Sequence, residues 1–180
     1  MANAFNTPYA TLSFPHLFEK RARAEGATPV YTAAFIFNPA AQQTPAYKAL
    51  VDACVAAAKA KFGDSVKMNT VAMPFRNAGE KEFAGYVDGD TYINTWSDNK
   101  PGIVDAARND VLLKEEVWAG QLVRANVTPF AWTNSGKKGV SIGLNHIQII
   151  KTDTPRIDGR ASAAKSFDDG LVSEDEEAMF

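Results

Sequence analysis

Residues 117–132 alternate between two kinds of side chain, and this alternation constrains the fold more than any other stretch of the chain. The odd positions are small and mostly apolar, whereas the even positions are polar in the middle and aromatic at the end. Successive side chains of a strand point to opposite faces, so we expect a long strand within 115–132 with one face in a core. The odd face is Val117, Ala119, Gln121, Val123, Ala125, Val127, Pro129 and Ala131, and the even face is Trp118, Gly120, Leu122, Arg124, Asn126, Thr128, Phe130 and Trp132.

Other stretches also have the β-branched and aromatic composition of strands. They are residues 29–39, 90–96, 102–106 and 138–151, and a further strand candidate precedes Lys20. Within 138–151, Ile147 and Ile149 fall out of phase with Val140, Ile142 and Leu144, which indicates a β-bulge.

One segment, TPAYKALVDACVAAAKAKFG, has the period of an amphipathic helix. Thr44 is suited to the N-cap, Pro45 to the first helical position and Gly63 to the C-terminal cap. The apolar residues at helical spacing are Tyr47, Leu50, Val51, Cys54, Ala58 and Phe62. Five or more strands with one such helix predict a mainly β fold, a small β-barrel or sandwich whose helix closes one end.

The composition predicts one globular domain followed by a tail. Hydrophobic residues make up 46% of the 180 residues and charged residues 22%, which is ordinary for a folded domain. From about residue 152 the chain is rich in Ser, Ala, Gly and charge and has little to bury. We therefore expect a domain over residues 1–151 and a flexible linker with a disordered acidic C-terminal tail over residues 152–180.

The charge is divided unevenly between these two parts. Residues 1–167 hold all 19 basic residues and 15 of the 21 acidic ones, a net charge of +4, whereas residues 168–180 have a net charge of −6. The acids of the tail are Asp168, Asp169, Glu174, Asp175, Glu176 and Glu177, and the chain ends on Phe180. The positively charged body is suited to binding a polyanion, and the negatively charged tail could compete with that polyanion for the body.

Cysteine content and hydropathy indicate a cytoplasmic location. The single Cys54 excludes a disulfide framework and a multi-cysteine zinc site, and it is typical of a reducing compartment. There is no run of about 18 apolar residues that could span a membrane, and the N-terminus lacks the pattern of a signal peptide. We expect no membrane association.

Catalytic motifs are lacking, so an enzyme is the reading that the sequence favours least. The two histidines, His16 and His146, have no metal-binding spacing, and NSGKKGVS lacks the spacing of a phosphate-binding loop. Asp88 and Asp90 are read as turn residues around Gly89. We expect no metal and no cofactor.

Aromatic rings on the polar faces of the strands are the candidate functional feature. Phe130 and Trp132 share the even face with Arg124, and Tyr92 and Trp96 share one face of residues 90–96, just before Lys100. Rings that stack on bases, with Lys and Arg that follow the backbone, bind single-stranded nucleic acid. Packing under a loop or at a dimer contact is the alternative for Phe130 and Trp132, and a core position is the alternative for Trp96.

Basic residues occur in the loops next to these rings. The complete set of candidate DNA-binding residues is Phe130, Trp132, Tyr92, Trp96, Lys100, Arg124, Lys137, Lys138, Phe75, Arg76, Lys20, Arg21 and Arg23.

Several stretches resemble the bacteriophage single-stranded DNA-binding proteins, the group built on an OB-fold with an acidic C-terminal tail. They are VYTAAFIFNPAAQQTPAYKALVDAC, MPFRNAGEKEFAGYVDGDTYINTW, VRANVTPFAW, GVSIGLNHIQII and the acidic end with Phe180, which together cover most of the chain in the family's order. The resemblance implies an OB-fold-like barrel, a DNA groove at residues 129–132 with Phe130 as a DNA-contacting ring, and phosphate contacts near residues 92–100. It is also compatible with a homodimer.

The function expected from these features is sequence-independent binding of single-stranded DNA in phage replication and recombination, in the cytoplasm of an infected bacterium. The tail would recruit a polymerase, helicase or primase, with Phe180 as its anchor. One alternative is a phage structural or protein-interaction module that uses the aromatic face for a protein partner. Another is an oligosaccharide-binding barrel, which would have no use for the −6 tail.

Overall fold

The computed structural model of the chain describes residues 3–158, and these form a mainly β fold with one long helix. The longer strands are β2 (Ala10–Arg21), β3 (Val30–Phe37), β6 (Thr91–Ser97), β8 (Leu122–Asn134) and β9 (Lys137–Lys151). The shorter strands are β1 (Phe5–Asn6), β4 (Val71–Ala72), β5 (Arg76–Asn77) and β7 (Gly102–Val104). The predicted acidic tail, residues 168–180, lies outside the described residues.

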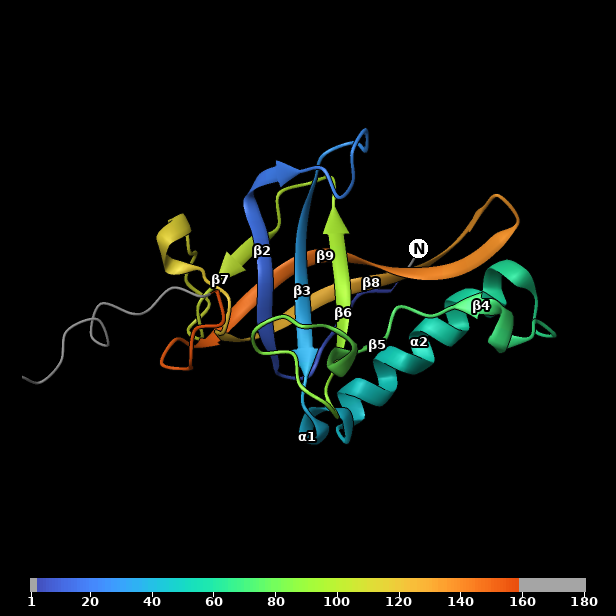
Figure 1. Cartoon of the computed structure of the whole chain (residues 1–180), viewed down its shortest axis with the longest axis horizontal. Helices are drawn as coiled ribbons and strands as arrows, with labels where there is room; N and C mark the ends of the chain where they lie inside the picture. The colour runs from blue at the N-terminus through green and yellow to red at the C-terminus, as the bar shows by residue number, and fades with distance from the viewer. Residues whose placement is uncertain (1–2, 159–180) are drawn as a thin grey trace, which may run out of the picture.

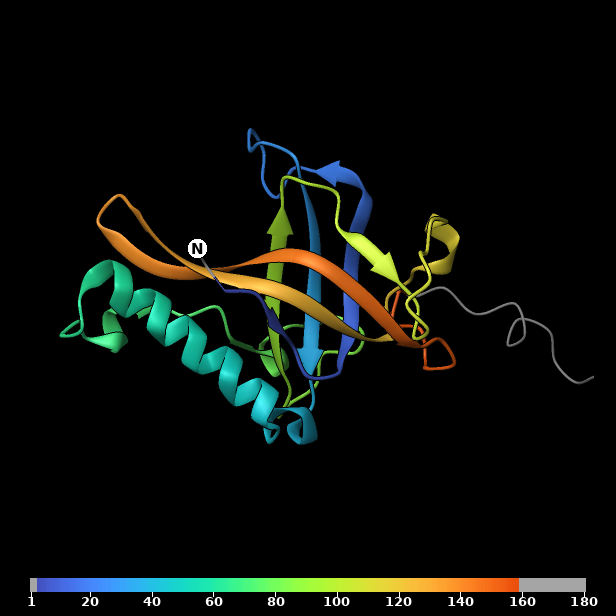
Figure 2. The ribbon, with the colours of Figure 1, turned by 180° about the vertical axis from the view of Figure 1, so that it is seen from behind.

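Five strands close into a ring in the order β8–β2–β3–β6–β9, and β9 pairs back to β8 (Figure 1). Parallel pairings join β9 to β6, β4 and β7, and the other pairings of the ring are antiparallel. A mainly β fold with a closed strand ring and one long helix is the arrangement predicted from the sequence. The β8–β9 hairpin continues beyond the ring and projects over the C-terminal end of the helix (Figure 2).

The long helix α2 (Pro45–Phe62) begins and ends where the sequence predicts. The Thr44 hydroxyl accepts a hydrogen bond from the Tyr47 backbone N–H, and Pro45 occupies the first turn, where no partner for its nitrogen is needed. At the other end, Gly63 has φ +95° and donates its N–H to the Lys59 carbonyl. A short helix, α1 (Pro39–Gln42), precedes α2 and has Asn38 as its N-cap.

The main core lies inside the strand ring and under α2. The α2 side chains Leu50, Cys54 and Ala58 are fully buried there, together with the inward residues of the strands. Burial raises the pKa of the Cys54 thiol to about 12, so this side chain is a neutral part of the core. On β8, Val123, Ala125 and Val127 are buried, which confirms the predicted core face of that strand.

The predicted bulge in β9 is present. The pairing with β8 shifts between Asn126 and Val127, whose partners are His146 and Leu144, so Asn145 is the extra residue. This shift keeps Ile147 and Ile149 in the core although they are out of phase with Val140, Ile142 and Leu144.

The N-terminal part of the predicted strand 115–132 is not a strand. Lys114–Glu116 form a short 3-10 helix, η3, and the strand begins only at Leu122. The reason is a turn in which the Gln121 side chain donates to the Glu116 carbonyl and accepts from the Trp118 N–H. Gly120 has φ +111°, which a β-strand does not allow.

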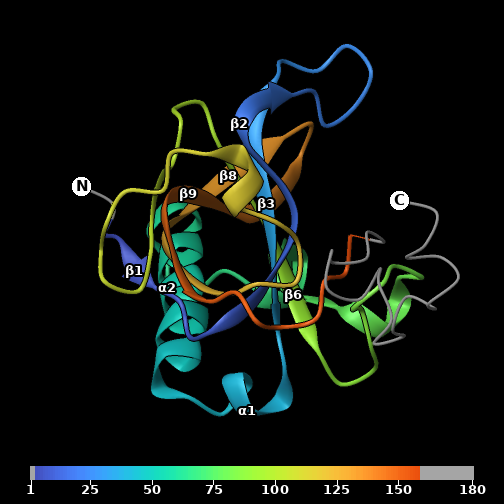
Figure 3. The ribbon, with the colours of Figure 1, turned by 90° about the vertical axis from the view of Figure 1, so that its left-hand side faces the viewer.

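A second small cluster lies on the outside of the ring, where the segment 78–90 covers the ends of β3 and β6. Tyr86, Tyr92, Ile36 and Ala78 form it, and Ile157 packs against it. This segment and α2 lie on opposite sides of the ring (Figure 3).

The first residues of the expected linker, 152–158, are described, and part of this stretch is in contact with the body. Thr154 donates its hydroxyl proton to the Gly120 carbonyl, and the Ile157 N–H donates to the Ala119 carbonyl at 3.1 Å. The Arg156 guanidinium lies 4.9 Å from the Trp118 ring centroid. The chain is therefore fixed to the body as far as Ile157. Over residues 3–158, no helix is both long and apolar enough to cross a membrane.

Candidate nucleic-acid interface

One row of residues crosses the outer face of the strand ring. In the strand pairings, His16 lies opposite Thr32, Thr32 opposite Trp96, Trp96 opposite Gly143 and Gly143 opposite Thr128. Side chains of directly paired residues share a face of the sheet, so this row is a continuous surface over β2, β3, β6, β9 and β8. It is the face opposite the core, because Ala33 and Thr95, the neighbours of Thr32 and Trp96, are buried.

Three aromatic side chains form a strip on this face, which we call the aromatic strip: Trp96, Phe130 and Trp132. The rings of Trp96 and Phe130 meet edge to face, with centroids 5.6 Å apart and planes at 85°. Trp132 follows on β8 and donates its indole N–H to the Ser141 hydroxyl at 2.9 Å. All three side chains are half-buried, so part of each ring is accessible to solvent.

A glycine in β9 makes room for one of these rings. A Cβ on Gly139 would lie 2.2 Å from atom Cζ2 of Trp132, well inside contact distance. Gly139 pairs with Trp132, so the indole lies against the β9 backbone at Gly139. The place of Trp132 in the strip depends on the absence of a side chain at Gly139.

Basic groups lie at both ends of the strip. At the end near the β2–β3 loop, the Arg23 guanidinium carbon is 5.1 Å from the Trp96 ring centroid. At the other end, Lys137 and Lys138 are exposed at the tip of the β8–β9 hairpin, where Lys138 Nζ lies 5.3 Å from the Phe62 ring centroid. Lys138 therefore faces α2, whereas Arg23 lies against a ring of the strip.

A ladder of polar side chains continues the face along β8 and β9 from Thr128. The bulge residue Asn145 donates its amide protons to Asn126 Oδ1 at 3.0 Å and to Thr128 Oγ1 at 2.9 Å. Further along, Arg124 donates to Gln148 Oε1 at 2.7 Å, and Arg124 is exposed. These groups are able to donate to or accept from a nucleic-acid backbone.

Other predicted basic residues lie outside the strip but near its ends. Lys20 Nζ is 5.7 Å from the Tyr31 ring centroid, and Lys100 Nζ is 5.0 Å from the Phe18 ring centroid. Arg21 donates to His16 Nε2 at 3.0 Å. The three predicted residues of the β2–β3 side, Lys20, Arg21 and Arg23, therefore contact a ring or imidazole, as Lys100 does.

Two of the predicted aromatic residues do not present open rings. Tyr92 is only 4% exposed, because Tyr86 covers it with ring centroids 5.1 Å apart. Phe75 packs against the main core and meets Tyr47 at 5.5 Å. Arg76 is exposed and pairs with Tyr92, away from the strip. The alternation placed Tyr92 correctly on the face of Trp96, but the segment 78–90 covers that end of the face.

The sequence analysis also missed an exposed aromatic pair, Phe14 and Phe83. Their ring centroids are 5.1 Å apart and the side chains are 49% and 48% exposed. Phe14 has φ +43°, a strained value for a residue with a side chain. The exposed residues close to Phe83 in the sequence include the acids Glu80, Glu82 and Asp88, and also Lys81. The available signal was the group of rings and acids in EKEFAGYVD.

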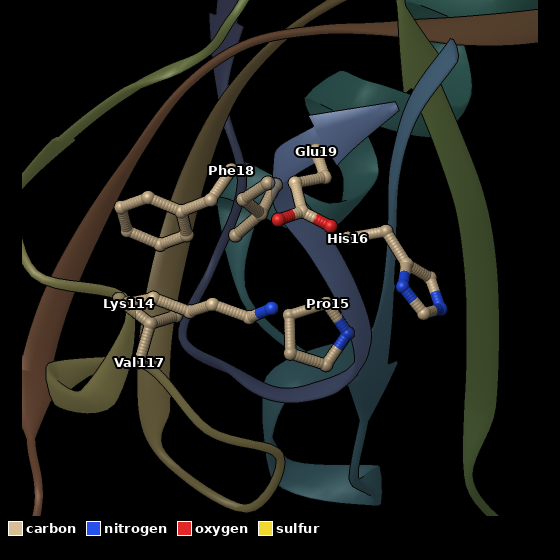
Figure 4. Close-up of a pocket in the computed structure, with 7 residues that line it drawn as sticks. Pro15, His16, Phe18, Glu19, Lys114 and Val117 are labelled. Atoms are coloured by element: carbon tan, nitrogen blue, oxygen red, sulfur yellow. The ribbon is translucent and has the colours of Figure 1, made fainter. Parts of the chain in front are cut away.

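A shallow cleft opens beside β2, lined by residues 15–19, Lys114 and Val117 (Figure 4). The His16 ring points toward β3 and β6, whereas the Lys114 and Phe18 side chains lie on the other side of β2 (Figure 4). Burial, followed by the positive charges of Arg21 and Lys114, holds the pKa of His16 below its ordinary value. Among residues 3–158, no three His, Cys, Asp or Glu side chains are placed together to hold a metal ion.

Comparisons with known proteins identify one family. A family model described as the single-stranded DNA-binding protein of Enterobacter phage Enc34 matches residues 6–179. No curated protein sequence matches the chain.

Two solved structures of the Enc34 protein are similar in fold. The complex of that protein with single-stranded DNA has a TM-score of 0.71 at 17% identity, with 84% of this chain and 88% of that chain covered. The protein solved without a named ligand has a TM-score of 0.67 at 18% identity, with 92% and 90% covered. The bacteriophage T7 single-stranded DNA-binding protein gp2.5 has a TM-score of 0.58 at 15% identity, with 89% and 98% covered.

Proposed function

The chain belongs to the family of the Enterobacter phage Enc34 single-stranded DNA-binding protein, and we propose that it binds single-stranded DNA without sequence preference. The observation that carries this proposal is the aromatic strip, with Arg23 over Trp96 at one end and Lys137 and Lys138 at the other. Membership of a DNA-binding family agrees with the expectation that the chain is not an enzyme.

The strip accounts for binding without sequence preference. Every base has a π-face, so a ring that stacks on one base is able to stack on any other. Trp96 lies on β6, and Phe130 and Trp132 lie on β8. These two strands flank β9, and all three side chains are half-buried on the same outer face. The chain would in this way coat exposed strands during phage replication and recombination.

The OB-fold arrangement also supports the aromatic strip as the DNA-binding surface. In OB-folds, the outer face of the second and third strands and the loops at its two ends bind oligonucleotides. In this ring those strands are β3 and β6, which carry Thr32 and Trp96, and the flanking loops carry Arg23 and Lys137. The aromatic strip thus lies on the face that this fold uses for ligands.

The experiment is a titration of oligo-dT against intrinsic tryptophan fluorescence at several salt concentrations. Quenching is expected because Trp96 and Trp132 lie in the strip. The logarithm of affinity should fall linearly with the logarithm of salt concentration, with a slope of about −0.7 per phosphate neutralised. Affinity that barely changes between low and high salt would contradict the proposal, because it would exclude phosphate contacts as its main source.

The C-terminal tail is proposed to act as a weak competitor for the same face. Its six acids are tethered to a body of net charge +4, and tethering gives a high local concentration, so weak contacts suffice. DNA would displace the tail and free it to recruit a polymerase, helicase or primase through Phe180.

A homodimer, which the family resemblance allows, would appear as twice the chain mass in analytical ultracentrifugation.

A protein-interaction module remains the second candidate function, and the pair Phe14–Phe83 is the observation that favours it. The carboxylates of Glu80, Glu82 and Asp88, close to Phe83 in the sequence, would repel phosphate. The two half-exposed rings would suit a protein segment with apolar and basic side chains. A mobility-shift assay with oligo-dT distinguishes the two functions. If the chain binds DNA, both the natural chain and Phe83→Ala should shift oligo-dT. If it is a protein-interaction module instead, the natural chain should give no DNA shift.

A further inference from the structure

His16 lies at one end of the row that crosses the outer face. Through Thr32 it is in register with Trp96, the first ring of the aromatic strip, so its side chain is on the same face. Its ring points toward β3 and β6 (Figure 4). Neither the position of His16 in the sequence nor a motif singled it out.

The protonation state of His16 in this structure follows from its hydrogen bond. Arg21 Nη1 lies 3.0 Å from His16 Nε2, and a guanidinium group has donors only. Nε2 therefore accepts this hydrogen bond, so the imidazole is neutral and carries its proton on Nδ1.

The charged groups around His16 are mostly positive. Arg21 lies on its own strand, and Lys114 of η3 reaches the same cleft from the other side, with Glu19 as the acid of that cleft. The residues that face it from β3 and β6, Thr32 and Trp96, are neutral. Burial together with Arg21 and Lys114 lowers the pKa of His16, which agrees with the neutral ring of the free protein.

We propose that His16 and Arg21 form a phosphate-binding pair at this end of the interface, and that His16 takes up one proton from solvent when single-stranded DNA binds. A phosphate placed between the two side chains would accept a hydrogen bond from Arg21. The hydrogen bond from Arg21 to His16 Nε2 would then be broken. The freed Nε2 takes the proton and becomes a second donor to the phosphate. The charges balance because the incoming anion offsets the positive charges that keep the ring neutral in the free protein.

The direction of the pH dependence follows from proton linkage. The complex holds more protons than the free protein wherever pH lies between the pKa of His16 in the complex and its lower pKa in the free protein. Affinity should therefore rise as pH falls through this window, whose lower limit lies below the ordinary histidine value of about 6.5 because the pKa of His16 is lowered in the free protein. The limiting gain for one proton is about tenfold in affinity per pH unit.

The experiment is a set of oligo-dT titrations between pH 5.5 and 8 at constant ionic strength, with three proteins: the natural chain, His16→Gln and His146→Gln. The sequence contains only these two histidines, so the two variants divide the histidine contribution between them. Glutamine keeps an amide donor but does not titrate. Calorimetry in buffers of different ionisation enthalpy counts the protons taken up.

The natural chain and His146→Gln should bind more tightly as pH falls and take up close to one proton, whereas His16→Gln should lose both effects. His146 Nδ1 accepts from the Gly102 N–H, and His146 pairs with Asn126 rather than with the row of Thr32 and Trp96, so it serves as the second-histidine control. A pH slope that persists in His16→Gln, or disappears in His146→Gln, would overturn the inference.

This inference rests on the proposed function, and the two fail in different ways. If no protein binds oligo-dT at any pH, the proposed function itself is wrong. If all three bind with salt dependence but with equal pH slopes, only the role of His16 is wrong. Should His16→Gln fold poorly, an NMR titration of His16 in the natural chain gives the same decision, because its pKa must rise on addition of oligo-dT.

Discussion

Phe130 is the residue at which stacking and folding are most cleanly separated. It lies half-buried on the outer face of β8, while Val127 and Pro129 of the same strand are buried. Phe130→Ala should therefore weaken binding of oligo-dT by about 1–3 kcal/mol, the value of one stacked base, without loss of the fold. Fluorescence titration gives the affinity, and thermal unfolding followed by circular dichroism checks the fold.

Two variants control this prediction. Phe130→Leu keeps apolar bulk against Trp96 but removes the π-face, so it should bind nearly as weakly as Phe130→Ala. Leu112→Ala alters a side chain that is 77% exposed in the loop before β8, and it should bind like the natural chain. A Phe130→Ala protein that melts far earlier than the natural chain would identify the ring as part of the core.

Alternation along a strand identified some of these residues and misled for others. It placed Phe130 and Trp132 on the face opposite Val123 and Val127, because side-chain direction in a strand is a local property. The same rule put Tyr92 on the face of Trp96. Whether that face is open depends on the segment 78–90, which packs over Tyr92 through Tyr86, and no local pattern reports such a contact. His16 was missed for the same reason, since its pairing with Thr32 is long-range.

At the scale of elements, the β8–β9 hairpin holds the indole of Trp132 in place through Gly139. Gly139→Ala would bring a methyl group into the space of the Trp132 ring, so the ring must rotate away and release its hydrogen bond to Ser141. We expect weaker binding of oligo-dT and a red-shifted tryptophan emission from a more exposed indole. Both are measured in the same fluorescence titration.

Ser141→Ala is the matched control for the hairpin, because it removes the hydrogen-bond acceptor of Trp132 but adds no bulk. It should weaken binding less than Gly139→Ala does. Equal losses in the two variants would mean that the hydrogen bond, rather than the flat backbone at Gly139, positions the ring.

Elements with local signals at their ends were predictable, and elements limited by distant contacts were not. Thr44 and Pro45 predict the start of helix α2 and Gly63 predicts its end, and the structure confirms both. The strand predicted from residue 115 begins at Leu122 instead, because Gly120 adopts a positive φ and the Gln121 side chain closes a turn onto Glu116. That turn also supports the Thr154 and Ile157 contacts, which the sequence of the linker did not indicate.

For the molecule as a whole, the division of charge sets the last prediction. The chain is fixed to the body as far as Ile157, which packs against the cluster that contains Tyr86 and Tyr92, on the outer face of β3 and β6. Ten residues, 158–167, separate Ile157 from the first of the six acids, a connection of roughly 40 Å at most when extended. Deleting residues 168–180 should tighten oligo-dT binding, most at low salt, where charge competition is least screened.

Two further chains separate charge from the terminal ring. A full-length chain with the six acids replaced by their amides should bind DNA like the deletion, because only the competing charge is lost. A chain lacking Phe180 alone should bind DNA like the natural chain but bind less tightly to a replication polymerase, helicase or primase in a surface-plasmon-resonance assay. If the deletion changes neither DNA affinity nor partner affinity, the tail has no part in either interaction, and the +4 body alone determines how the protein meets DNA.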